Sequence, residues 1–275
     1  MKSFIHLRRA RFIVLAAILC TALFGQEPAT STTPTPPAQK ENFHIYLLMG
    51  QSNMVGRDTS GLASQVDHPR VLALNADGLW AVARDPIHPQ VGRIACGSGP
   101  GIPFAQEMLK SADPKVTIGL VPCAVGGTPL RRWIKGKGGD LYENAVSRAK
   151  IAAEVGVIKG VLWHQGESDT EKQQNAESYE ARLTQMFKDF RADVNQPELP
   201  IVVGQLGEFL AISPTKYPYE KTVRAAIQHL PVVVPHVGYA DAAGLADKGD
   251  NLHFNVDAQK EMGARFAKAM QELRK

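Results

Sequence analysis

The sequence predicts an α/β fold, a three-layer α/β/α sandwich in which a central parallel sheet lies between two layers of helices. Three observations support this prediction. Apolar runs rich in β-branched residues recur along the chain, helical apolar stripes alternate with them, and polar, glycine-bearing clusters follow the runs. A chain of 275 residues with 44% hydrophobic side chains is long enough for one large domain of this kind.

Five largely apolar runs are the expected strands of the sheet. Their apolar residues do not alternate with polar ones, which is typical of strands that are covered on both faces. The last run is interrupted by Pro235. The runs cover residues 43–49, 116–121, 157–163, 201–206 and 232–239.

Helical patterns lie between these runs. Residues 103–112 follow a Gly/Pro turn, and residues 140–155 begin at the N-cap candidate Asp140 and stop at Gly156. Two apolar stripes at helical spacing predict two further helices, the second of them after a cap at Asn255, and we interpret both stripes as core contacts. The stripes consist of Tyr179, Leu183, Met186, Phe187 and Phe190, and of Met262, Phe266, Ala269 and Leu273.

The first 42 residues are expected to lie outside the folded domain. Residues 2–11 are basic and residues 12–24 are apolar, which is typical of a secretory signal peptide over residues 1–25 and short for a membrane-spanning helix. Residues 26–42 are rich in Pro and Thr, like a flexible linker. We therefore expect a secreted or periplasmic domain over residues 43–275, without stable membrane insertion after signal cleavage. An uncleaved N-terminal anchor is the alternative.

Charge and cysteine content narrow the expected partners. The formal net charge is +4, and the four basic side chains of the expected signal peptide account for it. The rest of the chain is neutral, so net charge does not indicate a nucleic-acid partner. Cys96 and Cys123 follow the signal, and the sequence leaves open whether they pair in an oxidising compartment or remain as free buried thiols.

Polar clusters follow the expected strands. The segments 50–54, 123–128 and 163–169 come just after three of the runs, and the segment 250–254 lies in the loop after the last run. In parallel α/β sheets the reactive groups gather at the carboxyl ends of the strands. We therefore expect the four clusters to meet at one edge of the sheet.

Ser52 and His253 are the candidate nucleophile and base of an acyl-transfer site. A serine needs a base to take its proton, and Asp250, three residues before His253, can reach a ring nitrogen and fix its tautomer. Glu167 is a second candidate for this orienting role. A turn serine and a capping carboxylate are simpler interpretations of single residues, so the prediction depends on their combination.

Acyl transfer also requires hydrogen-bond donors for the developing oxyanion. The amides of Ser52 and Gly127 and the side-chain amide of Gln165 are the expected donors, although Gly126 and Gly127 also suit a simple tight turn. No cofactor is expected, because no nucleotide-binding glycine motif is present. No metal is expected either, since the available ligand types match no known spacing. Those residues are His164, Glu167, Asp250 and His253.

Taken together, these motifs resemble a known group of hydrolases. GQSNM at 50–54, GGT at 126–128, WHQGE at 163–167 and D-x-x-H at 250–253 are similar to the motifs of the sialate O-acetylesterase and acetylxylan esterase branch of the SGNH hydrolases, carbohydrate esterase family six. The resemblance covers roughly residues 43–270. It implies a three-layer α/β/α fold of the flavodoxin-like type, with a parallel sheet.

The resemblance also implies an activity, which is metal-independent hydrolysis of acetyl esters on carbohydrate hydroxyls through an acetyl-serine intermediate. Ser52 matches the nucleophile and His253 the base, while Asp250 and Glu167 both remain candidates for the orienting acid. Gln165 stands where many SGNH enzymes carry Asn, and it keeps an amide donor. The expected partner is therefore an acetylated carbohydrate.

Side chains near the motifs are candidates for substrate binding. Guanidinium groups suit acidic or hydroxylated sugars and an indole face stacks on a sugar ring, although a solvated basic turn with a packed tryptophan is the alternative. A non-catalytic carbohydrate-binding protein and a lipase or thioesterase of the same superfamily are alternative functions. The candidate binding residues are Gln51, Asn53, Arg131 and Trp133. Gln51 and Asn53 flank Ser52, and the alternative for both is that they hold the acid loop rather than the substrate.

Overall fold

The structure is a computed structural model that describes residues 35–137 and 140–275. The expected signal segment 1–25 and residues 26–34 of the expected linker lie outside the described residues. The first described element is the short 3-10 helix η1, Lys40–Asn42, which leads directly into the first strand. Within the two described ranges, no helix combines the length and the apolar character needed to cross a membrane.

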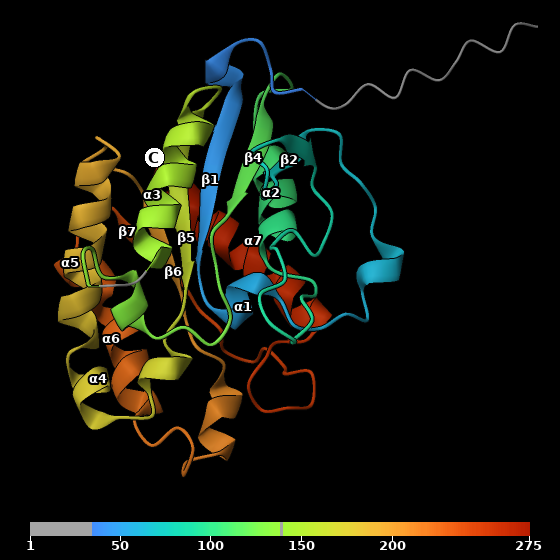
Figure 1. The fold of residues 1–275 in the computed structure, drawn as a ribbon. Coiled ribbons are helices and arrows are strands. Elements are labelled where there is room, and N and C mark those ends of the chain that lie inside the picture. The colour runs from blue at the N-terminus through green and yellow to red at the C-terminus, as the bar shows by residue number, and fades with distance from the viewer. Residues whose placement is uncertain (1–34, 138–139) are drawn as a thin grey trace, which may run out of the picture. The chain divides into compact units, whose positions relative to one another are not determined.

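A seven-stranded sheet forms the centre of the fold (Figure 1). Its strands are β1 (Phe43–Gly50), β2 (Val71–Leu74), β3 (Trp80–Val82), β4 (Thr117–Pro122), β5 (Val157–His164), β6 (Ile201–Gly204) and β7 (Val237–Ala240). The spatial order is β3-β2-β4-β1-β5-β6-β7, and all pairs are parallel except β2 with β3. β1 is thus the central strand, flanked by β4 and β5.

Helices cover both faces of this sheet (Figure 1). The longer ones are α2 (Gly101–Leu109), α3 (Asp140–Ala153), α5 (Tyr179–Asp193), α6 (Glu220–Val233) and α7 (Val256–Glu272), and the shorter ones are α1 (Ser52–Val55), α4 (Gln173–Glu177), η2 (Leu62–Ser64), η3 (Leu130–Trp133), η4 (Glu167–Asp169) and η5 (Glu208–Ile212). Alternating side chains of β1 separate two cores. Phe43 and Leu47 belong to the core with α3, α5 and α6, whereas Tyr46 and Leu48 belong to the core with α2 and α7. The predicted three-layer α/β/α sandwich is therefore confirmed.

The fifth expected strand, 232–239, is wrong in its first half. Val232 and Val233 end α6, and β7 begins only at Val237. The residues before them carry a helical apolar stripe, and its members are fully buried, so packing of this face favours the helix up to Val233. The stripe consists of Val223, Ile227 and Leu230. The sequence also did not predict β2 and β3, whose four and three residues are too few to carry a pattern.

Both cysteines outside the N-terminal segment are free. Cys96 and Cys123 are buried, and they belong to the two different cores on opposite faces of the sheet. Of the two outcomes that the sequence left open, the structure therefore has free buried thiols. Burial raises the pKa of the Cys123 thiol to about 12, so this side chain remains protonated at neutral pH.

The carboxyl ends of β1, β4 and β5 lie against one another. The amide of Gln51 donates to the carbonyl of His164 at 2.9 Å, and the amide of Val125 donates to the carbonyl of Gly50 at 3.1 Å. Gly50 has a φ of +130°, and a Cβ there would lie 2.1 Å from the His164 carbonyl oxygen, so only glycine fits. The loops after three strands therefore start at one edge of the sheet, as their position in the sequence predicts.

Candidate active site

A continuous hydrogen-bond chain joins three of the predicted site residues. Ser52 is the first residue of α1, directly after β1, and His253 lies in the loop between β7 and α7. The Nε2 atom of His253 is 3.0 Å from Ser52 Oγ, and its Nδ1 atom is 2.7 Å from Oδ2 of Asp250. Hydroxyl, imidazole and carboxylate are thus arranged in series across 201 positions of sequence. This is the arrangement in which a histidine can take a proton from a serine.

Asp250 is held by its own loop. Its Oδ1 atom accepts hydrogen bonds from the amides of Leu252 and His253, at 3.0 and 2.8 Å. Lys248 Nζ lies 3.2 Å from Oδ2, the oxygen that faces the imidazole. Burial acts to raise the pKa of Asp250, but the hydrogen bonds from the His253 ring and amide outweigh it and hold that pKa well below the usual range. The carboxylate therefore remains ionised beside the ring.

The imidazole of His253 is set up to be neutral at physiological pH. Only 15% of its side chain is exposed, and this burial is the main cause that lowers its pKa below 6.5. Asp250 acts in the opposite direction, while the positive charges of Arg57 and Lys248 lower the pKa further. With the Nδ1 proton directed to Asp250, Nε2 is left to accept the proton of Ser52.

Glu167 serves a different residue from Asp250. Its Oε1 atom accepts a hydrogen bond from the side-chain amide of Asn53, which also donates to the carbonyl of Leu252 at 3.1 Å. Asn53 in turn accepts from the amide of Phe254 at 3.1 Å. Glu167 is buried and makes no hydrogen bond with His253 among the described residues. Glu167 therefore braces Asn53, the residue that fastens the loop carrying His253. Burial raises the pKa of the Glu167 carboxyl group.

Three of the expected substrate contacts are internal instead. Gln51 is only 2% exposed, and its Oε1 atom accepts from the amide of Ser168 at 3.3 Å. Asn53 is only 1% exposed, and both polar atoms of its side chain bind protein groups. Trp133 is fully buried, packs edge-on against Trp163 with ring centroids 5.2 Å apart, and donates to Thr128 Oγ1. These buried side chains therefore cannot contact a sugar ring. The contacts of Asn53 and the packing of Trp133 agree instead with the alternatives that the sequence left open, a residue that holds the acid loop and a packed tryptophan. Arg131, by contrast, is exposed.

Gln165 is also placed differently from the expectation. Its side chain is fully buried, and its amide nitrogen donates to Gln51 Oε1, to the carbonyl of Thr128 and to Asp169 Oδ2 at 2.8 Å. Its oxygen accepts from the Tyr179 hydroxyl at 3.0 Å. Because its donors are engaged inside the protein, Gln165 is not an oxyanion donor. It fixes Gln51, the residue before the candidate nucleophile.

The two expected main-chain donors are unengaged. Neither the Ser52 amide nor the Gly127 amide donates a hydrogen bond to another residue of the described ranges. Gly127 has a φ of +69° and lies in a turn that Thr128 closes by donating to the Val125 carbonyl at 2.7 Å. Arg57 packs on the neighbouring Gly126, where a Cβ would lie 1.8 Å from Nη2.

One contributing residue was not singled out from the sequence. Gln259 of α7 is 1% exposed and donates from Nε2 to the main-chain carbonyl of Asn53 at 2.9 Å. It thereby ties α7 to the turn that carries Ser52. The sequence does carry a signal for Gln259, because it is a polar residue three positions before Met262 and thus falls on the apolar, buried face of the expected helix.

The ligand types noted in the sequence do not form a metal site. Among residues 35–137 and 140–275, no group of three or more His, Cys, Asp or Glu side chains is arranged to hold a metal ion. His164 is fully buried and binds the carbonyl of Gln205 at 3.0 Å. Its pKa is lowered by burial to about 4, so it is a neutral core residue.

Comparison with known proteins gives first the class and then the family. The mostly parallel α/β/α sandwich is shared with the solved structures of NanS and of a carbohydrate acetylesterase, so the fold class is the three-layer α/β sandwich. A family model described as carbohydrate esterase, sialic acid-specific acetylesterase matches residues 42–272. The chain belongs to this family of carbohydrate acetylesterases.

Individual relatives agree with this assignment. A probable carbohydrate esterase of Arabidopsis thaliana is 35% identical over an alignment of 263 residues, and the match covers 89% of this chain and 95% of the relative. The X-ray structure of that plant protein has a TM-score of 0.74 at 34% identity, covering 84% of this chain and 98% of its own. NanS has a TM-score of 0.65 at 17% identity, covering 85% and 98% of the two chains. A carbohydrate acetylesterase from Xanthomonas citri has a TM-score of 0.64 at 22% identity, covering 83% and 56%. These last two likenesses concern the fold.

Proposed function

We propose that the protein is a secreted carbohydrate O-acetylesterase that removes acetyl groups from sugar hydroxyls through an acetyl-serine intermediate. The observation that carries the proposal is the chain from Ser52 Oγ through the His253 ring to Asp250, with steps of 3.0 and 2.7 Å. The family membership supports the ester class, and the basic and apolar segments at the N-terminus support secretion.

In the first half-reaction, Ser52 Oγ attacks the carbonyl carbon of the acetyl ester while His253 Nε2 takes its proton. The carbonyl oxygen becomes an oxyanion, for which the Ser52 and Gly127 amides are the available donors. Collapse of the tetrahedral intermediate breaks the bond between the acetyl carbon and the sugar oxygen. His253 gives its proton to that oxygen, so the sugar leaves with a free hydroxyl and the acetyl group stays on Ser52.

In the second half-reaction, water replaces the sugar. His253 Nε2 takes a proton from the water as its oxygen attacks the acetyl carbon, and the ester bond to Ser52 breaks. The proton returns to Ser52 Oγ, and acetate leaves. Asp250 remains ionised throughout and stabilises the imidazolium that forms in each half-reaction.

Acetate release from acetylated xylan and from nitrophenyl acetate tests the proposal. We expect Ser52→Ala to lower kcat by about 10³-fold or more. Ser147→Ala, which changes an exposed serine of α3, is the matched control and should retain the wild-type rate. Acid-quenched wild-type protein should carry an acetyl group on Ser52. The absence of turnover on every acyl ester tried would favour a non-catalytic binding protein, and faster turnover of long-chain esters would favour a lipase or thioesterase.

A further inference from the structure

The turn that presents the Gly127 amide depends on supports outside itself. Among the described residues, neither Gly126 nor Gly127 donates or accepts a main-chain hydrogen bond, and the nearest support before them is the bond from the Val125 amide to the Gly50 carbonyl at 3.1 Å. Two adjacent glycines leave this backbone free to rotate. The direction of the Gly127 amide therefore depends on what holds the chain before and after the turn.

After the turn, the supports lead to one carboxylate, that of Asp169. Its Oδ2 atom accepts hydrogen bonds from the Leu130 amide at 2.7 Å and from Nε2 of Gln165 at 2.8 Å. The same Gln165 nitrogen donates to the Thr128 carbonyl at 3.2 Å. Asp169 is fully buried and lies in η4, just after β5. It therefore holds the chain after Gly127 both directly and through one side chain.

The same carboxylate is tied to the segment of the other expected donor. Gln165 Nε2 also donates to Oε1 of Gln51 at 3.1 Å, and the amide of Ser168 donates to that oxygen at 3.3 Å. Gln51 directly precedes Ser52, and Ser168 directly precedes the buried carboxylate. Both expected oxyanion donors therefore lie on segments that are tied to this carboxylate.

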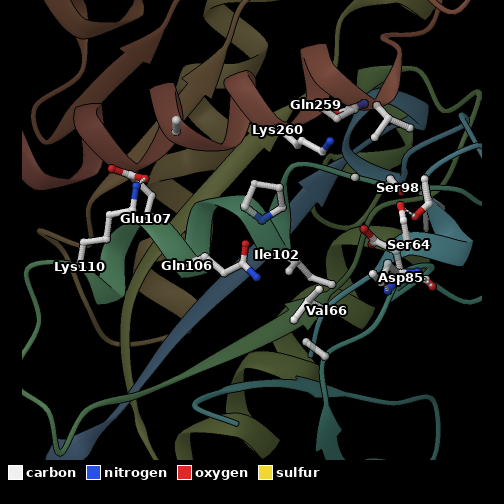
Figure 2. Close-up of a pocket in the computed structure, with 17 residues that line it drawn as sticks. Ser64, Val66, Asp85, Ser98, Ile102, Gln106, Glu107, Lys110, Gln259 and Lys260 are labelled. Atoms are coloured by element: carbon white, nitrogen blue, oxygen red, sulfur yellow. Dashed lines mark hydrogen bonds and ion pairs between the residues drawn. The ribbon is translucent and has the colours of Figure 1, made fainter. Parts of the chain in front are cut away.

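A second support of the Ser52 turn acts on that turn alone. Gln259 of α7 donates to the Asn53 carbonyl, and it lies in the wall of a cavity between α2 and α7 that is separate from the candidate active site (Figure 2). Its side chain makes no hydrogen bond with residues 125–130 in the part of the chain that the structure describes. Beyond the ends of β1 and β4, the hydrogen bonds that join the two donor segments therefore run through Asp169 and Gln165.

The three contacts of the Asp169 side chain require a carboxylate. Its Oδ1 atom accepts from Nη2 of Arg182 at 3.0 Å, while Oδ2 takes the two bonds on the site side. A carboxylate has only acceptors, so it can face donors with both oxygens. An asparagine of the same shape has one oxygen. It would turn its own NH2 group either toward Arg182 or toward Leu130 and Gln165, so that donors would face donors on one side.

We propose that Asp169 is a positioning residue of the hydrolytic site, which holds the Gly127 turn against the Ser52 segment so that both main-chain amides point at the same oxyanion. This role rests on the proposed esterase function, and Asp169 acts without contacting the substrate. Donors stabilise an oxyanion best at about 2.7–3.1 Å, so a small displacement of the turn weakens transition-state stabilisation more than it weakens substrate binding.

Hydrolysis of nitrophenyl acetate by the full folded protein tests this role, with kcat and KM measured separately. Asp169→Asn replaces the carboxylate at constant shape. Asp193→Asn is the matched control, because Asp193 of α5 also pairs with a basic side chain, Lys135, at 2.7 Å but lies outside the site. Asp169→Asn combined with Arg182→Met tests the hydrogen-bond arrangement, since without Arg182 the asparagine oxygen can turn to the site side. Circular dichroism and thermal midpoints verify that the variants fold.

We expect Asp169→Asn to lower kcat about 10²-fold, the scale of losing one oxyanion donor, with KM within about threefold of the wild-type value. Asp193→Asn should hydrolyse the ester at the wild-type rate. The double variant should be at least about tenfold more active than Asp169→Asn, because its two changes compensate each other at one contact.

The positioning role is wrong if Asp169→Asn keeps a wild-type kcat, if its loss appears in KM alone, or if Asp193→Asn loses as much. A double variant that is no more active than Asp169→Asn would also contradict it. All these outcomes are read against an active wild type, so they differ from failure of the proposed function, in which the wild-type protein releases no acetate from any acyl ester. In that case the positioning role is overturned as well.

Discussion

The two carboxylates near the histidine differ in what they touch. Asp250 contacts the ring nitrogen that faces away from Ser52, whereas Glu167 is buried against Asn53. Sequence spacing alone could not separate them, because both lie within reach of a compact site. From these contacts we propose that Asp250 is the orienting acid and that Glu167 is a positioning residue, and each role has a different kinetic consequence.

Replacing Asp250 should therefore cost more activity than replacing Glu167. We expect Asp250→Asn to lower kcat by about 10³–10⁴-fold, because an amide can no longer hold the tautomer or stabilise the imidazolium. Glu167→Gln keeps an oxygen that accepts from Asn53 and should cost about tenfold or less. Steady-state acetate release measures both. A larger loss in Glu167→Gln than in Asp250→Asn would reverse the assignment.

The pH profile should report the environment of His253. Its pKa lies below 6.5 and only the neutral ring can accept a proton, so kcat/KM should fall as pH drops through a value below 6.5. Lys248→Met removes a positive charge that disfavours protonation of the ring, so the acidic limb of the kcat/KM profile should move to higher pH. Lys172→Met changes an exposed lysine before α4 and should leave the limb in place. An unmoved limb in Lys248→Met would contradict this account.

At the scale of elements, the site depends on how closely the end of β1 approaches the end of β5. Gly50 is the residue at this crossing, and its missing side chain lets the chain turn directly into α1. The short helix then presents Ser52 to a loop that comes from the opposite end of the sequence. Gln259 and Asn53 fasten that loop and α7 to the turn.

An alanine at Gly50 should be much more disruptive than one at another left-handed glycine. The added Cβ would lie 2.1 Å from a main-chain oxygen that cannot move without breaking the β1–β5 ladder. We expect Gly50→Ala to lower the free energy of unfolding by about 4 kcal/mol or more. Gly244 has a φ of +72°, but the space where a Cβ would lie is open. Gly244→Ala should therefore lower the free energy of unfolding by only about 1–2 kcal/mol. Urea denaturation measures the free energy of unfolding of both variants. Similar losses in the two would show that the close approach of Gly50 to the His164 carbonyl does not limit the residue at position 50.

At the scale of the whole molecule, buried neutral histidines link stability to pH. His164 lies in the core beside Phe254 and Phe266, and its pKa of about 4 is below the value of 6.5 that it has in the unfolded chain. Between these two values the unfolded chain binds a proton at this ring and the folded protein does not. The contribution of His164 is therefore complete above pH 6.5 and is lost as pH falls toward 4.

Removing this ring should flatten the dependence of stability on pH. We expect the free energy of unfolding of His164→Gln to change less steeply between pH 6.5 and 4 than that of the wild type, by up to about 1.4 kcal/mol per pH unit. Urea denaturation at several pH values gives both slopes. His164→Gln lowers stability at every pH through lost packing, so the slope rather than the absolute value decides. Parallel curves would exclude His164 as a source of the pH dependence.

Local patterns in the chain were sufficient to predict the layers and the meeting of the loops. Apolar runs and helical stripes identify segments by their burial, and strand ends follow from where those runs stop. They failed where an element was too short, as in β2 and β3, or where two patterns overlapped, as at Val232 and Val233. The serine, histidine and aspartate were singled out because each belongs to a short motif with a chemical reason for its spacing, and the three side chains do lie together.

The roles of the side chains around these three residues depended on the packed fold. Gln165 and Trp133 carry polar groups that suit a substrate, yet both are directed inward, where Asp169 and Thr128 take up their hydrogen bonds. Whether a side chain faces solvent or another loop depends on contacts between segments that are far apart in the chain. Residue type and spacing therefore specify the chemistry that is available, whereas long-range packing selects which groups are exposed to use it.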